Sequence, residues 1–197
     1  MKQTFTLITL LSCIVTGHAQ VAFPLTNAVW KQRNGNGEAA PSYSLIGTKT
    51  TDTVIDGVTY RKLYLSSDDD VFTESEFIGG IREAIGGKVY FRTATSSTEK
   101  LIYDFSVVTG DTISDATTGG KNGIVVAVDY VTIASTTRKR ISFRQQTSTA
   151  TWNEGAWIEG IGNNNLGGLL GSPMLQPTCD CSVKTVCLTV NNSPTYH

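Results

Sequence analysis

Residues 157–170, W-I-E-G-I-G-N-N-N-L-G-G-L-L, form the stretch that decides the fold. Side chains alternate along a strand, so Trp157, Glu159 and Ile161 are predicted to share one face. A carboxylate between two apolar side chains is unfavourable unless it is paired. We therefore predict that Trp157 fills a core and that Glu159 is a buried structural anion. The candidate partners are the arginines of one segment: Arg138, Arg140 and Arg144.

The glycines of this stretch predict where its backbone turns. Glycine weakens a plain strand, so Gly160 and Gly162 predict a bulge, a bend or a close approach of backbones. The run G-N-N-N at residues 162–165 is typical of a turn, and residues 167–170 resume an apolar segment.

The rest of the chain is typical of consecutive β-hairpins joined by short turns. Asp56-Gly57 is a strong two-residue hairpin signal because both turn positions favour positive φ. Gly86-Gly87 marks a second hairpin, and a short Ser/Thr turn after residue 134 marks a third. The main predicted strands are residues 23–33, 43–46, 50–55, 58–65, 77–84, 88–93, 100–108, 123–134 and 138–146.

The clearest alternation lies in residues 100–108. One face of this predicted strand is apolar and consists of Leu101, Tyr103, Phe105 and Val107. No interval is convincingly helical, so we predict an all-β fold built as an antiparallel up-and-down meander. Such a long meander must close on itself or fold over, because its edges otherwise stay unpaired. We expect a barrel or a strongly curved sheet, with a two-sheet β-sandwich as the alternative.

Residues 1–19 are typical of a secretory signal peptide. Lys2 supplies the positive start, and residues 5–15 form an apolar run too short to span a bilayer. Small residues end at Ala19, so we predict cleavage there and a single all-β domain at residues 20–197. The alternative is a lipoprotein cleavage box ending at Cys13. Either route predicts a secreted or periplasmic protein.

The charge balance excludes some partners. Of 16 Lys and Arg side chains, loss of Lys2 with the leader leaves 15 against 17 acidic ones, a net charge of about −2. The only basic cluster is Arg138-Lys139-Arg140, which is no extended patch, so we expect no nucleic-acid partner. No later segment is long and apolar enough to be a transmembrane segment.

The cysteines near the C-terminus favour an oxidising compartment. Without Cys13, three remain: Cys179, Cys181 and Cys187. A bond between Cys179 and Cys181 would be strained, so we predict that Cys187 forms a disulfide with one of them. The odd thiol leaves an intermolecular bond open. Three thiolates without a fourth ligand do not indicate a metal site.

Few catalytic groups remain in the predicted mature domain. His18 leaves with the leader and His197 is the last residue, which excludes histidine-based triads and histidine-ligated metals. No glycine loop has the context of a phosphate or dinucleotide site. We therefore predict no catalytic residue, no metal and no cofactor.

Two other functions stay open on the residues alone. A barrel with an open interior lined by aromatic side chains would bind a small apolar ligand or a glycan. Alternatively, Glu159 with Glu154 or Asp104 would act as the carboxylate pair of a glycan hydrolase. Three side chains are candidate ligand contacts in either case: Trp30, Trp152 and Trp157.

Several segments together resemble an uncharacterised family of secreted β-rich domains from Bacteroidota. The matching segments are residues 56–64, 81–83, 88–91, 101–105, 110–112, 138–140, 157–162 and 168–170, followed by the cysteine-containing tail. In that family the module often precedes a C-terminal sorting domain for type IX secretion. The resemblance implies export and a β-rich module, and it carries no catalytic residues.

The printed sequence ends at His197 without such a sorting domain, which leaves open the route past the outer membrane. We predict a secreted or periplasmic, non-catalytic β module that acts as a structural or interaction protein. Its partner, a protein or a glycan, cannot be named from the residues.

Overall fold

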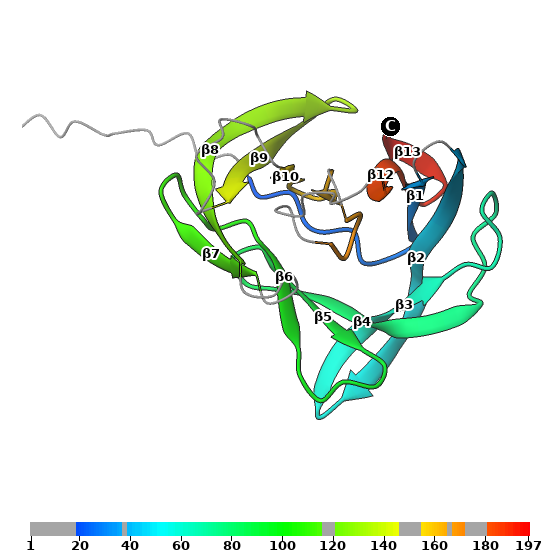
Figure 1. Cartoon of the computed structure of the whole chain (residues 1–197). Coiled ribbons are helices and arrows are strands. Elements are labelled where there is room, and N and C mark those ends of the chain that lie inside the picture. Colours follow the sequence, from blue (N-terminus) through cyan, green and yellow to red (C-terminus); the bar gives the residue numbers. More distant parts are fainter. Residues whose placement is uncertain (1–18, 37–38, 116–120, 146–154, 165–166, 172–180) are drawn as a thin grey trace, which may run out of the picture.

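The computed structural model describes residues 19–36, 39–115, 121–145, 155–164, 167–171 and 181–197. Within these ranges the chain forms strands and turns and no helix, so the predicted all-β class is confirmed. The strands make two antiparallel sheets, each curled strongly enough to resemble half of a barrel (Figure 1). Across the same ranges, no helix has the length and hydropathy to cross a membrane.

The larger sheet has eight strands in the order β13-β12-β1-β2-β3-β4-β5-β6. Their bounds are β1 Ala28–Asn36, β2 Ala39–Ile55, β3 Val58–Leu65, β4 Glu76–Ala84, β5 Lys88–Thr93, β6 Lys100–Asp104, β12 Cys181–Val190 and β13 Ser193–Tyr196. The smaller sheet has five strands in the order β11-β10-β9-β8-β7. Their bounds are β7 Thr112–Asp115, β8 Lys121–Ile133, β9 Thr136–Gln145, β10 Gly155–Ile158 and β11 Gly162–Asn163.

Most neighbours in each sheet follow one another in sequence, as in the predicted meander. One pairing is not sequential. β12 returns to lie antiparallel beside β1, so that Ala28 faces Val190 and Trp30 faces Leu188. This return joins the two ends of the described chain within one sheet.

Two-residue turns with left-handed backbone connect three hairpins. Asp56 and Gly57 have φ of 50° and 76°, as the sequence predicts for the β2–β3 turn. Ala134-Ser135 and Asn191-Asn192 make the same kind of turn without glycine, between β8 and β9 and between β12 and β13. The region of the β12–β13 hairpin was predicted only as a cysteine-containing tail.

The single strand predicted for residues 100–108 is wrong, because β6 ends at Asp104. Leu101 lies opposite Tyr90 while Tyr103 lies opposite Val89, so Ile102 is an extra residue on the β6 side. An extra residue shifts the alternation to the other face. Leu101 is accordingly 47% exposed, whereas Tyr103 is fully buried.

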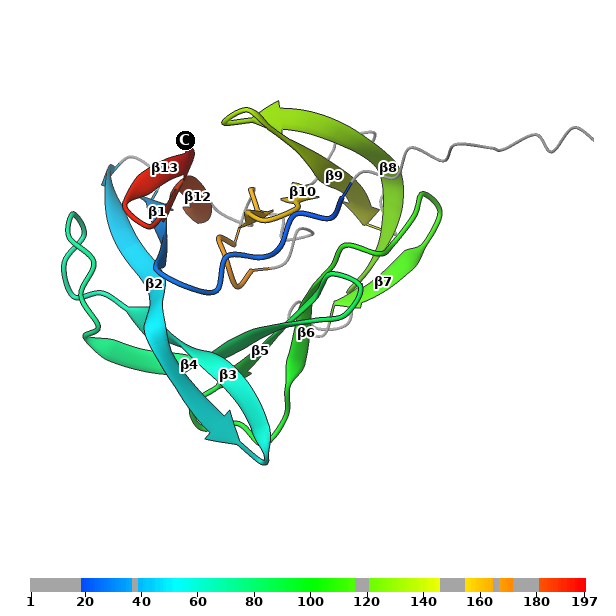
Figure 2. The same cartoon turned by 180° about the vertical axis from the view of Figure 1, so that it is seen from behind.

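Two parts of the chain lie inside the curved walls. Residues 20–27, here called the strap, run between the sheets beside residues 155–164 and 167–171, which include the short strands β10 and β11 (Figures 1 and 2). Phe23 of the strap stacks on Trp30, with ring centroids 5.6 Å apart, and lies equally close to Tyr103. The buried core therefore forms around the strap and the stretch that contains Trp157.

Candidate functional site

Glu159 lies in a tight turn rather than on a strand face. β10 ends at Ile158, Ile161 donates its backbone N–H to the Ile158 carbonyl at 3.0 Å, and Gly160 has φ of 69°. Because the strand ends there, the predicted alternation across Trp157, Glu159 and Ile161 is wrong as a description of one strand face. All three side chains are nevertheless buried.

The turn is fastened to strand β9. The backbone N–H of Glu159 donates to the Lys139 carbonyl at 2.9 Å, and its carboxylate accepts the Lys139 backbone N–H at 3.3 Å. The Glu159 carbonyl accepts a hydrogen bond from Arg138 Nη1 at 3.0 Å. Glu159 is only 6% exposed, so these backbone contacts surround a buried carboxylate.

The three candidate arginines have different surroundings. Arg138 is buried beside Glu159, and burial lowers the pKa of its guanidinium against the opposing effect of the Glu159 charge. Arg140 instead pairs with Asp129 through both carboxylate oxygens, one of them at 2.8 Å from Nε. Arg144 faces Ile124 on β8. Of the three, Arg138 lies beside Glu159, but it binds the carbonyl of that residue, so the predicted pairing of an arginine with the Glu159 carboxylate is not formed among the described residues.

A second carboxylate, that of Glu83 on β4, lies at the start of the strap. Its Oε2 accepts the Phe23 backbone N–H at 3.0 Å, and its Oε1 accepts Gln20 Nε2 at 3.4 Å. Burial raises the pKa of Glu83 despite the hydrogen bond from Phe23, and the charge of Glu159 raises it further. Two carboxylates from different sheets thus interact across the start of the strap.

Glu83 carries no pattern that marks it as a site residue in the sequence. It stands within residues 81–83, one of the segments of the family resemblance, and that is the only signal that singles it out. Residues 138–140 and 157–162 are two further segments of the resemblance; Glu159 interacts with Glu83 through its charge, and Arg138 is hydrogen-bonded to Glu159. We call the group of Glu83, Arg138 and Glu159 the strap site.

Gly160 and Gly162 leave room for side chains of other segments to approach the backbone closely. A Cβ on Gly160 would lie 2.8 Å from Val21 Cγ1 and 2.5 Å from Arg138 Nη1. A Cβ on Gly162, which has φ of 102°, would lie 2.8 Å from the Tyr103 hydroxyl oxygen. Of the predicted alternatives, a bend is found at Gly160, and the close neighbours of both glycines are mainly side chains.

Replacing Gly162 with alanine is expected to lower the free energy of unfolding by roughly 2 kcal/mol, because backbone strain and a clash with Tyr103 add together. Gly57→Ala is the matched control, since Gly57 also has positive φ but a Cβ there would meet nothing within 4 Å. It should lose only about 1 kcal/mol. Urea unfolding of both variants measures the difference, and equal losses would contradict the close contact.

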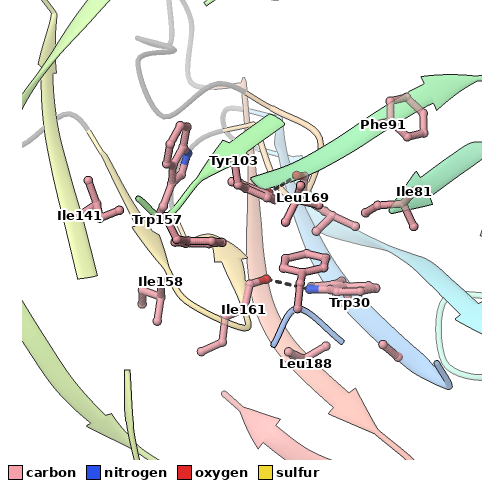
Figure 3. Close-up of a cluster of buried hydrophobic side chains, with 14 of the residues drawn as sticks. Trp30, Ile81, Phe91, Tyr103, Ile141, Trp157, Ile158, Ile161, Leu169 and Leu188 are labelled. Atoms are coloured by element: carbon pink, nitrogen blue, oxygen red, sulfur yellow. Dashed lines mark hydrogen bonds between the residues drawn. The ribbon is translucent and has the colours of Figure 1, made fainter. Parts of the chain in front are cut away.

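The tryptophans predicted as ligand contacts differ in placement. Trp30 is fully buried and donates its Nε1–H to the Ile161 carbonyl at 2.9 Å (Figure 3). Trp157 is buried against Tyr103 and Phe143, with ring centroids at 5.5 and 4.5 Å. Trp152, like Glu154 of the hydrolase alternative, lies outside the described residues.

Tyr103 connects this aromatic cluster, through its hydroxyl group, to Asn163 and Leu169. Its hydroxyl donates to the Leu169 carbonyl (Figure 3) and accepts the Asn163 backbone N–H at 3.1 Å. Complete burial raises the pKa of the Tyr103 hydroxyl far above its usual range, so it stays protonated.

The predicted disulfide of Cys187 is not formed. Cys187 has a free thiol on β12, half-buried, with its sulfur 3.9 Å from the Thr189 hydroxyl. Cys179 lies outside the described residues, and Cys181 begins β12, where it faces Asn36 across the pairing with β1. Cys187 faces Lys31 in that pairing, six residues along the strand from Cys181. Along an extended strand that separation is about 20 Å, which is too long for a disulfide.

A second polar cluster covers one face of β3, β4 and β5. Arg82 donates to both carboxylate oxygens of Glu99 at 2.6 Å, and its guanidinium lies 4.3 Å from the ring centroid of Tyr90. The Tyr60 hydroxyl also donates to Glu99, at 2.8 Å. Burial acts to raise the pKa of Glu99, but the hydrogen bonds from Arg82 and Tyr60 outweigh it and lower this pKa.

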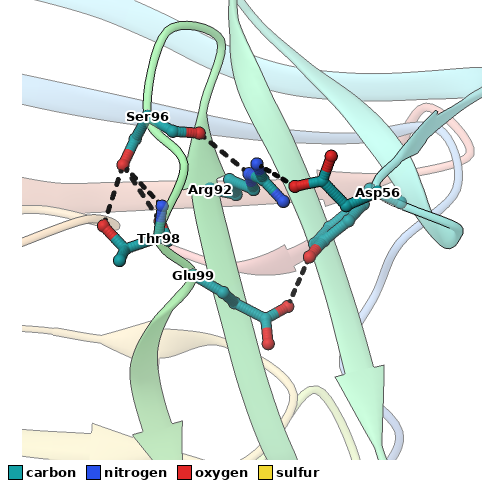
Figure 4. A network of polar contacts seen from close by, with 6 residues as sticks. Asp56, Arg92, Ser96, Thr98 and Glu99 are labelled. Atoms are coloured by element: carbon teal, nitrogen blue, oxygen red, sulfur yellow. Dashed lines mark hydrogen bonds and ion pairs between the residues drawn. The ribbon is translucent and has the colours of Figure 1, made fainter.

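This cluster reaches the β2–β3 turn through Arg92. Its Nη2 donates to Asp56 at 2.6 Å, and its Nε donates to the Ser96 carbonyl at 2.9 Å (Figure 4). The Ser96 hydroxyl donates to the Thr98 carbonyl and accepts the Thr98 backbone N–H. These bonds position the next residue, Glu99, beside the strands. We call Asp56, Tyr60, Arg82, Tyr90, Arg92 and Glu99 the outer cluster.

Replacing Glu99 with glutamine is expected to lower the free energy of unfolding at neutral pH by about 1 kcal/mol, the scale of a partly exposed ion pair. The folded-state pKa of Glu99 is depressed, so its contribution is present above the unfolded value of about 4.3 and is lost as pH falls through the folded value. Unfolding measured between neutral and acid pH should therefore show the variant and the parent converging in acid. A constant gap at all pH values would contradict this assignment.

Among the described residues, no three His, Cys, Asp or Glu side chains gather as metal ligands would. No family model, curated protein or solved structure matches this chain.

Proposed function

We propose that this chain is an exported, non-catalytic β module that acts as a structural or interaction protein, secreted or periplasmic after cleavage at Ala19. The observation that carries the proposal is the use made of the charged groups in the strap site. Glu83 accepts a backbone N–H of the strap, Arg138 donates to the backbone of the adjoining turn, and Glu159 accepts a backbone N–H of β9. Groups committed in this way hold the chain together and are poorly placed to act on a ligand.

The aromatic residues support the same proposal. A ligand-binding barrel requires an interior that its aromatic residues leave open. Tyr103, Phe105 and Trp157 are instead buried against one another, with ring centroids 5.5 to 6.4 Å apart. The strap places Phe23 in the same group. These contacts favour a structural interior over a ligand cavity.

The accessible residues of the outer cluster, Asp56, Arg82, Tyr90 and Glu99, form the surface that we propose for partner contact, while Tyr60 and Arg92 are buried beneath them. Tyrosine and arginine are the residue types that contribute most to protein interfaces. Arg82 is held between Glu99 and Tyr90, so a partner would meet a face that is already ordered and would lose little side-chain entropy on binding.

A binding screen of the processed protein against glycans, lipids and candidate proteins tests this proposal. Tyr90→Ala should weaken binding to any partner found by roughly tenfold, with unfolding nearly unchanged. Tyr130→Ala is the matched control, because Tyr130 is a half-exposed tyrosine on the smaller sheet. Loss of binding in the control and not in Tyr90→Ala would overturn the choice of surface.

The carboxylate hydrolase is the second candidate function, and one observation favours it. Glu83 has a raised pKa beside a second buried carboxylate, an arrangement that hydrolases use for their general acid. Turnover of a polysaccharide by the protein, abolished in Glu83→Gln, would establish this function and overturn the non-catalytic proposal. Asp104, the other predicted partner, instead accepts hydrogen bonds from Ser106.

A further inference from the structure

The strap site contains one buried carboxylate, that of Glu159, and one half-buried carboxylate, that of Glu83, and among the described residues neither belongs to an ion pair. The nearby cations are directed at carbonyl groups: Arg138 at Glu159, and Lys139 Nζ at Phe105 and Val107, at 2.7 and 3.0 Å. The two carboxylates therefore repel one another, and Arg138, which lies beside Glu159, is hydrogen-bonded to the carbonyl of that residue and not to its carboxylate.

The side chain of Gln20 lies next to one of these carboxylates, that of Glu83. Gln20 donates its side-chain Nε2–H to Glu83, and the same amide packs against Gly87, where a Cβ would lie only 2.4 Å from Nε2. Phe23, three residues further on, donates its backbone N–H to the other oxygen of Glu83. The carboxylate of Glu83 thus binds the strap at two points, the side chain of Gln20 and the backbone of Phe23.

Cleavage after Ala19 would convert the backbone amide of Gln20 into a free α-ammonium group. We propose that the strap site is a binding site for the chain's own processed N-terminus, with the α-ammonium of Gln20 as the counter-ion of Glu83 and Glu159. This inference rests on the proposed export and cleavage. Processing then does more than remove the leader, because it supplies the charge that the site lacks and fixes the strap between the sheets.

The charged groups around this N-terminus come from four elements. β4 contributes Glu83, the β10–β11 turn contributes Glu159, and β9 contributes Arg138 and Lys139. Lys88, next to Gly87 on β5, is paired with Asp104 at 3.5 Å. Each nearby cation already has an acceptor, so the ammonium meets the two carboxylates without a free competitor among these groups.

The test compares one protein before and after its N-terminus is freed. The protein carries a short Ser/Gly extension before Gln20, and a protease then removes the extension and leaves Gln20 first. Intact mass confirms that Gln20 has kept its amine and has not cyclised with loss of ammonia. At pH 6, removal of the extension should raise the folded-to-unfolded ratio by up to roughly fivefold.

The pH dependence has a definite sign. The carboxylates should raise the pKa of the α-ammonium in the folded state above its unfolded value of about 8. The added stability is then fully present below that value and is lost as pH rises through the folded-state pKa. A hydrogen bond without charge would leave the advantage unchanged over this range, which would overturn the proposal.

Two variants assign the effect to the site. Glu83→Gln should abolish the advantage of the freed N-terminus, and Glu76→Gln should keep it, because Glu76 is an exposed glutamate at the far end of the same strand. An advantage that survives Glu83→Gln, or none in the parent, would overturn the inference. If Glu83→Gln fails to fold, NMR titration of the parent decides, since an α-amine pKa at or below about 8 contradicts the binding.

N-terminal sequencing of the exported protein separates the two proposals. A first residue other than Gln20 would contradict the proposed cleavage, while the protease-released chain would still test the binding of the ammonium. A first residue of Gln20 with no effect of charge on stability would leave the export proposal standing and overturn this inference.

Discussion

Replacing Glu159 with alanine is expected to lower the free energy of unfolding by about 3 kcal/mol or more, the typical effect of breaking a buried charged contact. The change leaves the Lys139 backbone N–H without its acceptor and removes the negative charge beside the buried guanidinium of Arg138. Both losses occur where water cannot replace them, since Glu159 is almost completely buried. Urea unfolding with an unchanged m-value measures the effect.

Glu159→Gln is the control for that variant, because it keeps an acceptor oxygen and removes only the charge. It should lose about 1 kcal/mol. A Glu159→Ala protein that unfolds like the parent but no longer binds a partner would show that Glu159 serves recognition and not the fold.

Replacing Trp30 with alanine should have the largest effect of all, a loss of about 3 to 5 kcal/mol. Trp30, on β1 of the larger sheet, is fully buried against Phe23 of the strap, and its Nε1–H donates to the Ile161 carbonyl. The variant would lose a large apolar side chain, together with its contacts to the strap at Phe23 and to the turn at Ile161. Thermal and urea unfolding both measure the effect.

Trp30→Phe distinguishes packing from hydrogen bonding. It keeps an aromatic ring against Phe23 and removes the donor to Ile161, so it should lose roughly half as much as the alanine variant. Equal losses would mean that the hydrogen bond dominates. A loss below about 1 kcal/mol for Trp30→Ala would contradict the assignment of this side chain to the core.

The local features of the fold could be predicted from the sequence because their causes are local. Asp56-Gly57 specifies a turn by its own backbone preferences, and Gly86-Gly87 separates two apolar strands in the same way. The division into two curled sheets could not be predicted. It arises because the consecutive strands β6 and β7 do not pair, and because β12 pairs with β1 instead of β11. Strands as far apart in the chain as β1 and β12 share no local pattern that indicates their pairing.

The candidate site was predicted only in part, for similar reasons. Glu159 attracts attention because it stands between apolar residues, but nothing local shows that its strand has already ended at Ile158. Glu83 is an ordinary charged residue near a hairpin, and only the strap lying over it makes it unusual. The exposure of Leu101 follows from one extra residue in β6, which periodicity cannot locate.

The pairing of β12 with β1 also has a consequence for how the protein is made. A ribosome produces β1 well before β12, so β1 waits for strands β2 to β11 before its partner exists. Contacts between such distant segments form slowly, because a large loop must close first. The larger sheet of a newly made chain thus stays incomplete until β12 has been synthesised and has paired with β1.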